Sequence, residues 1–226
     1  MRAAIVGCGR MGRALEEMLA ERGHATVARI GREDRLDAAR GVDVAFEFTR
    51  PDAARGNVET LLEAGVPTVC GTTGWDPAAA RALSARLGVA FLAAPNFSIG
   101  VAVLRRLVAE AARMLAPFPE FEPGIVERHH AKKADVPSGT ARLLAETIAP
   151  LRPAGAAPPI AALRQGGQPG EHEVLFEGPD ECLGLVHRAR SRRIFAAGAV
   201  RAAEWMVETG PKGPVTFDDF FERSRP

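Results

Sequence analysis

The sequence predicts an α/β protein of two domains, and three observations support this class. Short apolar runs alternate with amphipathic segments over the first hundred residues. Such alternation is typical of a parallel sheet that is covered by helices on both faces. Later the rhythm changes to a long helix and then to closely spaced strands with Gly and Pro turns, which favours an α+β domain with a mixed or antiparallel sheet. A chain of 226 residues is long enough for both cores.

The expected first domain covers residues 1–100. Its strands are expected within residues 3–6, 25–30, 42–49, 66–74 and 89–97, and the last two run into loops. Leu15, Met18 and Leu19 share one face of the first helix. Further helices are expected after Pro51 and after Pro77. Because the carboxyl ends of parallel strands meet at one edge of the sheet, a ligand crevice is expected at that edge.

The expected second domain covers residues 101–209. Residues 101–115 have the spacing of a long amphipathic helix, and residues 140–149 have that of a shorter one. Strands are expected at 124–130, 160–167, 171–178 and 182–189, with a Pro/Ala loop at 152–159 and a last helix at 191–208. A linker at 210–214 leads to an apolar tail. We expect residues 210–226 to pack back on the first domain.

Composition and charge argue against several functions. The net charge of +1 argues against a broad basic surface for nucleic acid or an anionic membrane. The apolar runs are too short to cross a bilayer, and the first ends at glycines too soon for a signal peptide. Cys8, Cys70 and Cys182 are odd in number and widely spaced, so neither a disulfide framework nor a zinc motif is expected. We therefore expect a cytoplasmic protein with no bound metal and no nucleic-acid or membrane partner.

The first chemical signal is the stretch GCGRMG at residues 7–12. Gly7, Gly9 and Gly12 fit the pattern G-x-G-x-x-G between an expected strand and an expected helix, where this pattern binds dinucleotides. Gly7 permits a tight turn, Gly9 lets a pyrophosphate approach the backbone, and Gly12 lets helix and strand pack closely. The motif predicts a Rossmann domain whose cofactor also contacts Cys8, Arg10 and Met11. The alternative is a glycine-rich turn without a ligand.

The end of the second strand favours NADPH over NADH. In Rossmann domains an acidic residue about 20 positions after the glycine motif binds the ribose 2′-hydroxyl. Here Gly31-Arg32 stands at that position, and Glu33-Asp34 comes slightly later. A guanidinium suits the geometry of a 2′-phosphate, so Arg32, assisted by Arg10, is expected to hold NADPH. The alternatives are that Arg32 is a solvated loop charge and that NADH is used.

Three further loops follow expected strands and should line the same crevice. Their candidate cofactor residues are Phe48, Thr49, Gly71, Thr72, Thr73, Ala94, Pro95, Asn96 and Phe97. The GTTG loop at 71–74 offers backbone and hydroxyl groups to a ribose or a nicotinamide, and Asn96 could bond an amide. Each loop alone is more often an ordinary turn. Their common placement at strand ends favours the cofactor site.

Residues 127–141, ERHHAKKADVPSGTA, contain two of the three lysines in an arginine-rich chain. Histidine can exchange a proton near neutral pH. Lysine can do so where burial or neighbouring cations lower its pKa, whereas arginine stays protonated. His129 and Lys133 are therefore candidates for proton transfer. Because neighbours on a strand point to opposite faces, His129 and His130 are a poor chelating pair, and a metal pair or core packing is the alternative for them.

The same stretch offers an anion site at a helix N-terminus. The sequence PSGT leads into a helix, where Gly139 and Thr140 present backbone N–H groups and a hydroxyl. Ser138 is placed to cap this helix. Together with the nearby cations, the arrangement predicts an acidic small-molecule substrate. We interpret Lys132 as a solvated charge and Asp135 as a salt-bridge or turn residue.

The chain resembles the 4-hydroxy-tetrahydrodipicolinate reductase (dihydrodipicolinate reductase) family of lysine and diaminopimelate biosynthesis. Residues 127–141 are similar to its signature, E-x-H-H-x-x-K-x-D-x-P-S-G-T-A. The similarity extends along nearly the whole chain, through the stretches at 7–12, 48–51, 71–74, 94–101, 170–172 and 191–205. Two departures are the replacement of an acidic residue by Gly31-Arg32 and a shorter segment at 150–163.

The resemblance implies a Rossmann domain and a substrate domain whose sheet assembles a homotetramer. It implies a hydride transfer from NADPH or NADH to a ring carbon of a cyclic imine or diene dicarboxylate, with tetrahydrodipicolinate as the product. By the family pattern, His129 is the general acid/base and Lys133 the proton donor. The implied substrate-binding residues are His130, Ser138, Gly139 and Thr140.

Two other functions stay open from the residues alone. A different Rossmann oxidoreductase, acting on a small acid or semialdehyde, would explain residues 1–100 and would turn over an open-chain aldehyde. A non-enzymatic dinucleotide sensor would bind NADPH without turnover. The oxidoreductase alternative leaves the combination of HHxxK and PSGT unexplained.

Overall fold

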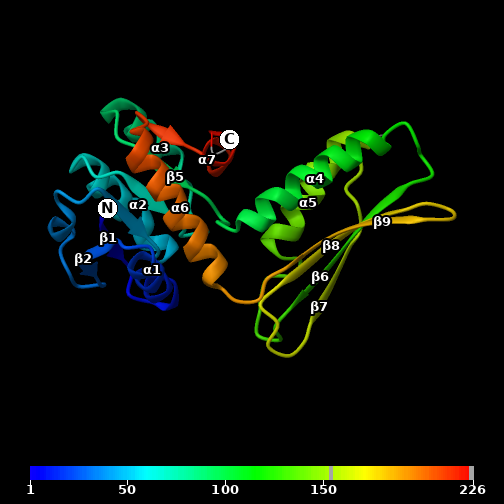
Figure 1. Ribbon diagram of the computed structural model, residues 1–226, viewed down its shortest axis with the longest axis horizontal. Helices are drawn as coiled ribbons and strands as arrows, with labels where there is room; N and C mark the ends of the chain where they lie inside the picture. Colours follow the sequence, from blue (N-terminus) through cyan, green and yellow to red (C-terminus); the bar gives the residue numbers. More distant parts are fainter. Residues whose placement is uncertain (153–154, 224–226) are drawn as a thin grey trace. The chain divides into compact units, whose positions relative to one another are not determined.

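The computed structural model describes residues 1–152 and 155–223, which form two compact units (Figure 1). The first unit contains Met1–Phe97 and the chain from Arg193 onward, and the second contains Ser98–Arg192. Residues 153–154 of the predicted Pro/Ala loop, and residues 224–226 of the predicted tail, lie outside the described residues. None of the described helices has the length and apolar character that a bilayer crossing needs.

The first unit contains a parallel sheet, as predicted. Its strand order is β10-β5-β4-β3-β1-β2. The strands are β1 Arg2–Val6, β2 Ala25–Ile30, β3 Val44–Glu47, β4 Thr68–Cys70, β5 Phe91–Ala93 and β10 Pro214–Val215. Its helices are α1 Arg10–Glu21, α2 Pro51–Glu63, α3 Ala78–Leu87, α6 Arg193–Thr209 and α7 Phe217–Arg223, with the 3-10 turn η1 Leu36–Ala39. β3 ends two residues earlier than expected, while β4 and β5 run into loops at the carboxyl edge, as expected.

Helix α6 lies in the first unit, although the sequence analysis assigned residues up to 209 to the second domain. The helix packs against α1. Two ion pairs join the helices: Arg193 of α6 pairs with Glu21, and Glu204 of α6 pairs with Arg22 at 2.7 Å. A Cβ atom at Gly198 would lie 1.7 Å from the carbonyl oxygen of Phe97, so α6 is seated closely on this unit. An amphipathic pattern predicts a buried face but does not say which sheet buries it.

The second unit is a mixed four-stranded sheet with two helices on one face (Figure 1). The strand order β7-β6-β8-β9 joins β6 Glu122–His129, β7 Ile160–Arg164, β8 Glu171–Glu177 and β9 Cys182–Arg188. The covering helices are α4 Ile99–Leu115 and α5 Gly139–Ile148, and the 3-10 turn η2 Ala149–Leu151 follows α5. β7 pairs parallel with β6, while the other pairs are antiparallel. The parallel pair follows from the β6-α5-β7 crossover, which returns the chain in the same direction.

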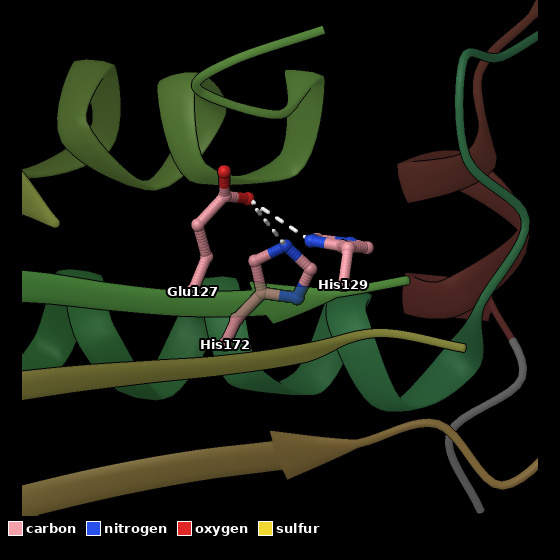
Figure 2. A group of neighbouring side chains, drawn as sticks. All are labelled: Glu127, His129 and His172. Atoms are coloured by element: carbon pink, nitrogen blue, oxygen red, sulfur yellow. Dashed lines mark ion pairs between the residues drawn. The ribbon is translucent and has the colours of Figure 1, made fainter. Parts of the chain in front are cut away.

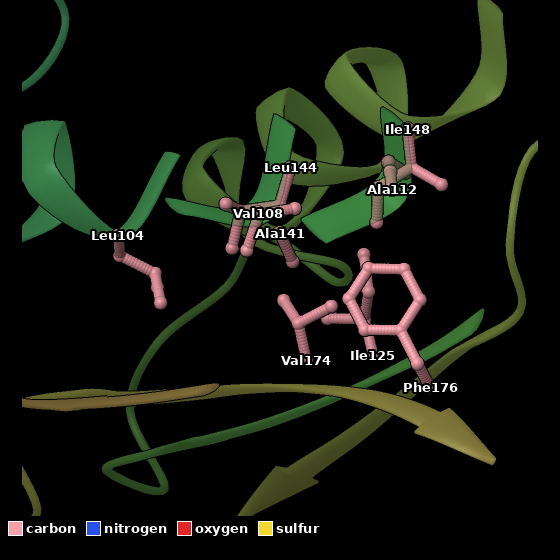
Figure 3. Close-up of a cluster of buried hydrophobic side chains, with 10 residues drawn as sticks. Leu104, Val108, Ala112, Ile125, Ala141, Leu144, Ile148, Val174 and Phe176 are labelled. Atoms are coloured by element: carbon pink, nitrogen blue, oxygen red, sulfur yellow. The ribbon is translucent and has the colours of Figure 1, made fainter. Parts of the chain in front are cut away.

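The helix-covered face of this sheet changes character along β6. Residues Ile125, Glu127 and His129 all point to this face because side chains alternate along a strand. Glu127 and His129 form a polar end with side chains of the neighbouring strands (Figure 2). Ile125, Val174 and Phe176 instead meet α4 and α5 in an apolar core (Figure 3). The core therefore fixes the strand that carries the polar cluster.

Candidate active site and cofactor cavity

The turn between β1 and α1 has the geometry that its glycines predict. Gly7 has a φ of +108°, and a Cβ there would lie 2.2 Å from the carbonyl oxygen of Phe48. A Cβ at Gly12 would lie 2.0 Å from the carbonyl oxygen of Gly7. Gly9 has no atom within 4 Å of such a Cβ, and it precedes α1 without a side-chain cap. Gly7 and Gly12 therefore allow close packing, while the amides at the start of α1 can face an anion.

Two cavities lie at the carboxyl edge of the parallel sheet. The larger, of about 590 Å³, is lined among others by Gly7, Cys8, Arg32, Arg35, Thr49 and Arg50. The smaller, of about 260 Å³, is lined by Met11, Phe48, Thr49, Pro51, Gly71, Thr72 and Thr73. Thr49 lines both cavities, so they share a wall. These two cavities bring together residues from four predicted loops: the glycine turn and the loops after β2, β3 and β4.

Other predicted cofactor residues line neither cavity. They are Gly9, Arg10, Gly12, Ala94, Pro95, Asn96 and Phe97. Phe97 is buried, and its ring centroid lies 5.9 Å from that of Phe48 and 5.4 Å from that of Phe217. Phe97 thus supports Phe48, which does line the smaller cavity.

The loop after β2 places arginines on the larger cavity. The backbone N–H of Gly31 donates to a carboxylate oxygen of Asp34 at 2.8 Å, so this acid is engaged by its own loop. Arg35 is paired with Asp37 and Arg50 with Asp52. Arg32 is exposed and has no ion-pair partner among residues 1–152 and 155–223.

A buried glutamate that the sequence analysis missed fixes the wall between the cavities. Glu47 accepts hydrogen bonds from the hydroxyl of Thr49, from the amide of Asn57 at 3.2 Å and from the thiol of Cys70 at 3.2 Å. Burial and the neighbouring Glu47 raise the pKa of the Cys70 thiol, so it stays protonated. The backbone N–H of Thr49 also donates to Thr72 at 2.8 Å, which ties two cavity-lining loops together.

The polar end of β6 contains a buried cluster of one carboxylate and two imidazoles (Figure 2). Oε2 of Glu127 lies 3.4 Å from Nδ1 of His129 and 3.7 Å from Nε2 of His172. The two rings meet edge to face with centroids 5.0 Å apart. The other oxygen, Oε1, accepts from Arg164 at 2.7 Å and from the backbone N–H of Ser138 at 3.0 Å. The sheet register makes this cluster, since Glu127 is opposite His172 and His129 is opposite Arg164.

The charges of this cluster follow from its surroundings. Burial alone would raise the pKa of Glu127, but hydrogen bonds from Ser138 and Arg164 outweigh it and hold the pKa below its usual value. Burial lowers the pKa of His129, and Glu127 partly offsets this effect. Burial and the neighbouring His129 lower the pKa of His172 to about 4. Near neutral pH the cluster therefore holds an ionised carboxylate and a neutral His172.

The predicted proton donor lies on the turn that follows β6. Nζ of Lys133 is 2.6 Å from a carboxylate oxygen of Asp135, so Asp135 forms the expected salt bridge. Burial would raise the pKa of Asp135, but Lys133 and the backbone N–H of Gly139 lower it. The charge of Lys133 also lowers the pKa of His129, so the two candidates for proton transfer are electrostatic neighbours. Lys132 is exposed.

The predicted substrate-binding residues surround the start of α5. Ser138 is the N-cap of α5; its hydroxyl accepts from the backbone N–H of Ala141 and lies 3.1 Å from Nε2 of His172. Gly139 and Thr140 are the first two residues of the helix. His130 is half-buried beside buried His129, and its Nε2 lies 3.0 Å from the guanidinium of Arg192.

The chain matches known proteins over nearly its whole length. Residues 1–97 match the N-terminus of dihydrodipicolinate reductase, and residues 100–221 match its C-terminus. The chain is 39% identical over 206 residues to a 4-hydroxy-tetrahydrodipicolinate reductase of Archaeoglobus fulgidus, covering 83% of this chain and 77% of that protein. It is 38% identical over 224 residues to the Christiangramia forsetii protein of the same name, covering 92% and 93%.

A solved structure shows the same likeness. Dipicolinate-bound dihydrodipicolinate reductase from Paenisporosarcina sp. TG-14 is 25% identical, with a TM-score of 0.76, and the match covers 96% of this chain and 97% of that chain. The fold, the glycine turn and the cavities define an oxidoreductase with a Rossmann unit that uses NAD(P)H. The chain belongs to the dihydrodipicolinate reductase family, which confirms the resemblance found in residues 127–141.

Proposed function

We propose that the chain reduces 4-hydroxy-tetrahydrodipicolinate (dihydrodipicolinate) to tetrahydrodipicolinate with NAD(P)H, in lysine and diaminopimelate biosynthesis. The observation that carries this proposal is the grouping of His129, Lys133 and the N-terminus of α5 at one end of β6. A cation, a protonatable imidazole and helix amides suit a cyclic dicarboxylate. The family membership supports the same reaction.

In this proposal the two units have different tasks. The first unit binds the dinucleotide along the two cavities at its sheet edge. The second holds the substrate by His130, Ser138, Gly139 and Thr140, the last two through the amides that begin α5. Lys133 releases its contact with Asp135 and gives a proton to the carbon beside the one that receives the hydride, and His129 acts as general acid/base.

The assay for this reaction generates the unstable substrate in place. Pyruvate and aspartate semialdehyde are combined with the synthase that precedes the reductase, and NADPH absorbance is followed with and without the protein. We expect loss of NADPH only when all components are present. A control without synthase exposes the protein to the open-chain aldehyde, and turnover there would favour the semialdehyde oxidoreductase. Cofactor binding without turnover in the complete mixture would favour the sensor.

We propose NADPH as the preferred cofactor and NADH as the alternative. Arg32 on the larger cavity is available for a 2′-phosphate, whereas Asp34 is already bonded to Gly31. We expect Arg32→Ala to raise the KM for NADPH roughly 10- to 100-fold, the equivalent of about 1.5–3 kcal/mol for a charge-assisted hydrogen bond, and to leave the KM for NADH nearly unchanged. Arg40→Ala, an exposed arginine outside the cavity, is the matched control. An unchanged preference for NADPH over NADH in Arg32→Ala would refute the proposed contact between Arg32 and the 2′-phosphate.

We also propose a homotetramer in the cytoplasm. The face of the second sheet that α4 and α5 leave uncovered carries exposed Leu163 and Val186 beside the paired charges of Arg128 and Glu171. Apolar side chains with paired charges suit an interface between copies of the chain. Cys8, Cys70 and Cys182 are free thiols, which suits a reducing compartment.

A further inference from the structure

We infer that Glu127 is a positioning residue that fixes the tautomer and orientation of His129. The inference rests on the proposed function, in which His129 exchanges protons with the substrate. Glu127 is fully buried, and it lies on the same face of β6 as His129, two residues away. Glu127 is the first residue of the family signature, but the sequence gives it no role, and its carboxylate is the anion beside the imidazole.

Two buried atoms without hydrogen bonds lie near each other in this pair, and Oε2 of Glu127 has a second, longer contact of 3.7 Å with Nε2 of His172. Among the described residues, Oε2 of Glu127 and Nδ1 of His129 are both buried and neither has a partner at hydrogen-bond geometry. The two atoms lie 3.4 Å apart, and Oε1 is already engaged by Arg164 and Ser138. An imidazole N–H that points to a buried carboxylate satisfies both groups, so the proton of neutral His129 belongs on Nδ1. At 3.4 Å the contact is longer than most hydrogen bonds, as catalytic hydrogen bonds often are before substrate binds.

The opposite edge of the same ring lies next to Gly170, a residue without a side chain. Gly170 passes over His129 so closely that a Cβ there would lie 2.9 Å from Nε2. With Nδ1–H directed to Glu127, Nε2 carries the lone pair and takes or gives the proton. The carboxylate also stabilises the imidazolium that forms when Nε2 is protonated, in a site where burial alone would oppose it.

The groups that face His129 come from every neighbouring strand. Glu127 on β6 favours the charged imidazole, whereas Arg164 on β7 and Lys133 on the following turn oppose it. Asp135 on that turn favours it, and on β8 the neutral ring of His172 packs edge to face. Glu127 is the largest of the favourable contributions, so neutralising it removes the main support for the imidazolium.

The same three side chains have the spacing of metal ligands, since their donor atoms lie within 4.8 Å of one another. The guanidinium of Arg164 already neutralises the carboxylate at 2.7 Å, which weakens the attraction of Glu127 for a further cation. We therefore assign the cluster to proton positioning, and a bound metal becomes an outcome of the test.

The test compares Glu127→Gln with the wild-type protein. The variant keeps the size of the side chain and removes its charge. Its amide N–H can donate to Nδ1 of His129, which favours the tautomer with the proton on Nε2. We expect kcat to fall roughly 100-fold, the scale of general acid–base catalysis. The imidazole of His129, followed by nitrogen NMR and assigned with His129→Gln among five histidines, should lose the Nδ1–H tautomer and titrate at a lower pH. The limb of the pH–rate profile that reports the titration of His129 should also shift to lower pH.

A matched control is Glu171→Gln. Glu171 is also buried and paired with arginines, but it lies on the opposite face of the sheet from His129. This control should lose stability without changing the tautomer or the pH profile. If Glu127→Gln does not fold, Glu127→Asp is the second variant. It keeps the charge but moves the carboxylate away from His129 by the length of one methylene. A lower kcat and an altered titration of His129 are expected for it too.

Each outcome bears on one proposal. Unchanged kcat and an unchanged His129 tautomer in Glu127→Gln would overturn the positioning role. Stoichiometric zinc in the purified wild-type protein, measured by elemental analysis, would overturn it in favour of a metal site. If His129→Gln itself keeps full turnover, the proposed function of His129 fails, while the NMR result still decides whether Glu127 sets the tautomer.

Discussion

Lys133→Arg is expected to lower kcat by about 100- to 10,000-fold, the usual contribution of a positioned proton donor. Arginine keeps the positive charge, can still pair with Asp135 and can still attract a carboxylate, but its guanidinium does not release a proton. Substrate KM should therefore change little. Steady-state kinetics with the substrate generated in place, together with NADPH binding by fluorescence, separate lost chemistry from lost binding.

The chain supplies a matched control in the neighbouring lysine. Lys132 is exposed, and the same substitution there, Lys132→Arg, should leave kcat within a few-fold of the wild type. Lys133→Met then separates the two properties of the side chain, since it removes the charge as well and should raise KM in addition to lowering kcat. Turnover of Lys133→Arg equal to that of Lys132→Arg would take Lys133 out of the proton path.

Gly170→Ala is the second substitution from which a large loss is expected. The new methyl would lie 2.9 Å from Nε2 of His129, on the edge that exchanges protons. We expect kcat to fall about 100-fold because that edge is covered or the ring is displaced. The φ of +153° at Gly170 is strained for alanine, so the free energy of unfolding should fall by about 1–3 kcal/mol as well.

Gly167→Ala, in the same loop, tests whether the loss is local. No atom lies within 4 Å of a Cβ at Gly167, so this variant should keep both turnover and stability. Denaturant unfolding of both variants shows whether Gly170→Ala is folded at the assay temperature. A folded Gly170→Ala protein with wild-type kcat would show that Nε2 of His129 does not need this clearance.

The sequence predicts five strands of the first sheet because each is a short apolar run, but it does not predict β10, which lies in the expected linker and tail near the end of the chain. β1, β3 and β4 are each followed by a helix of the same unit, and the GCGRMG turn lies between β1 and α1. Alternation of apolar and amphipathic runs therefore suffices for these five strands, while the end of β3 remains uncertain. The parallel pairing of β7 with β6 is harder to predict from the sequence. Closely spaced strands suggest antiparallel neighbours, whereas the crossover through α5 makes this one pair parallel.

The candidate site was predicted in part for the same physical reason. His129 and Lys133 are four residues apart, and residue chemistry identifies them without any knowledge of register. Arg164 and His172 reach Glu127 only because β7 and β8 pair with β6. Residue composition and spacing do not predict the register of that pairing. Glu127 itself was within reach, since the period of two along β6 places it beside His129.

The boundary of the first unit has a consequence for synthesis of the chain. Residues 98–192 leave the ribosome as an uninterrupted segment that holds every strand of its own sheet. The first unit begins earlier but must wait for α6 and β10, which come from the last part of the chain. Domains generally fold as units while they are being made. The inserted unit can thus reach its native state on the ribosome, whereas the dinucleotide unit is completed only near chain release.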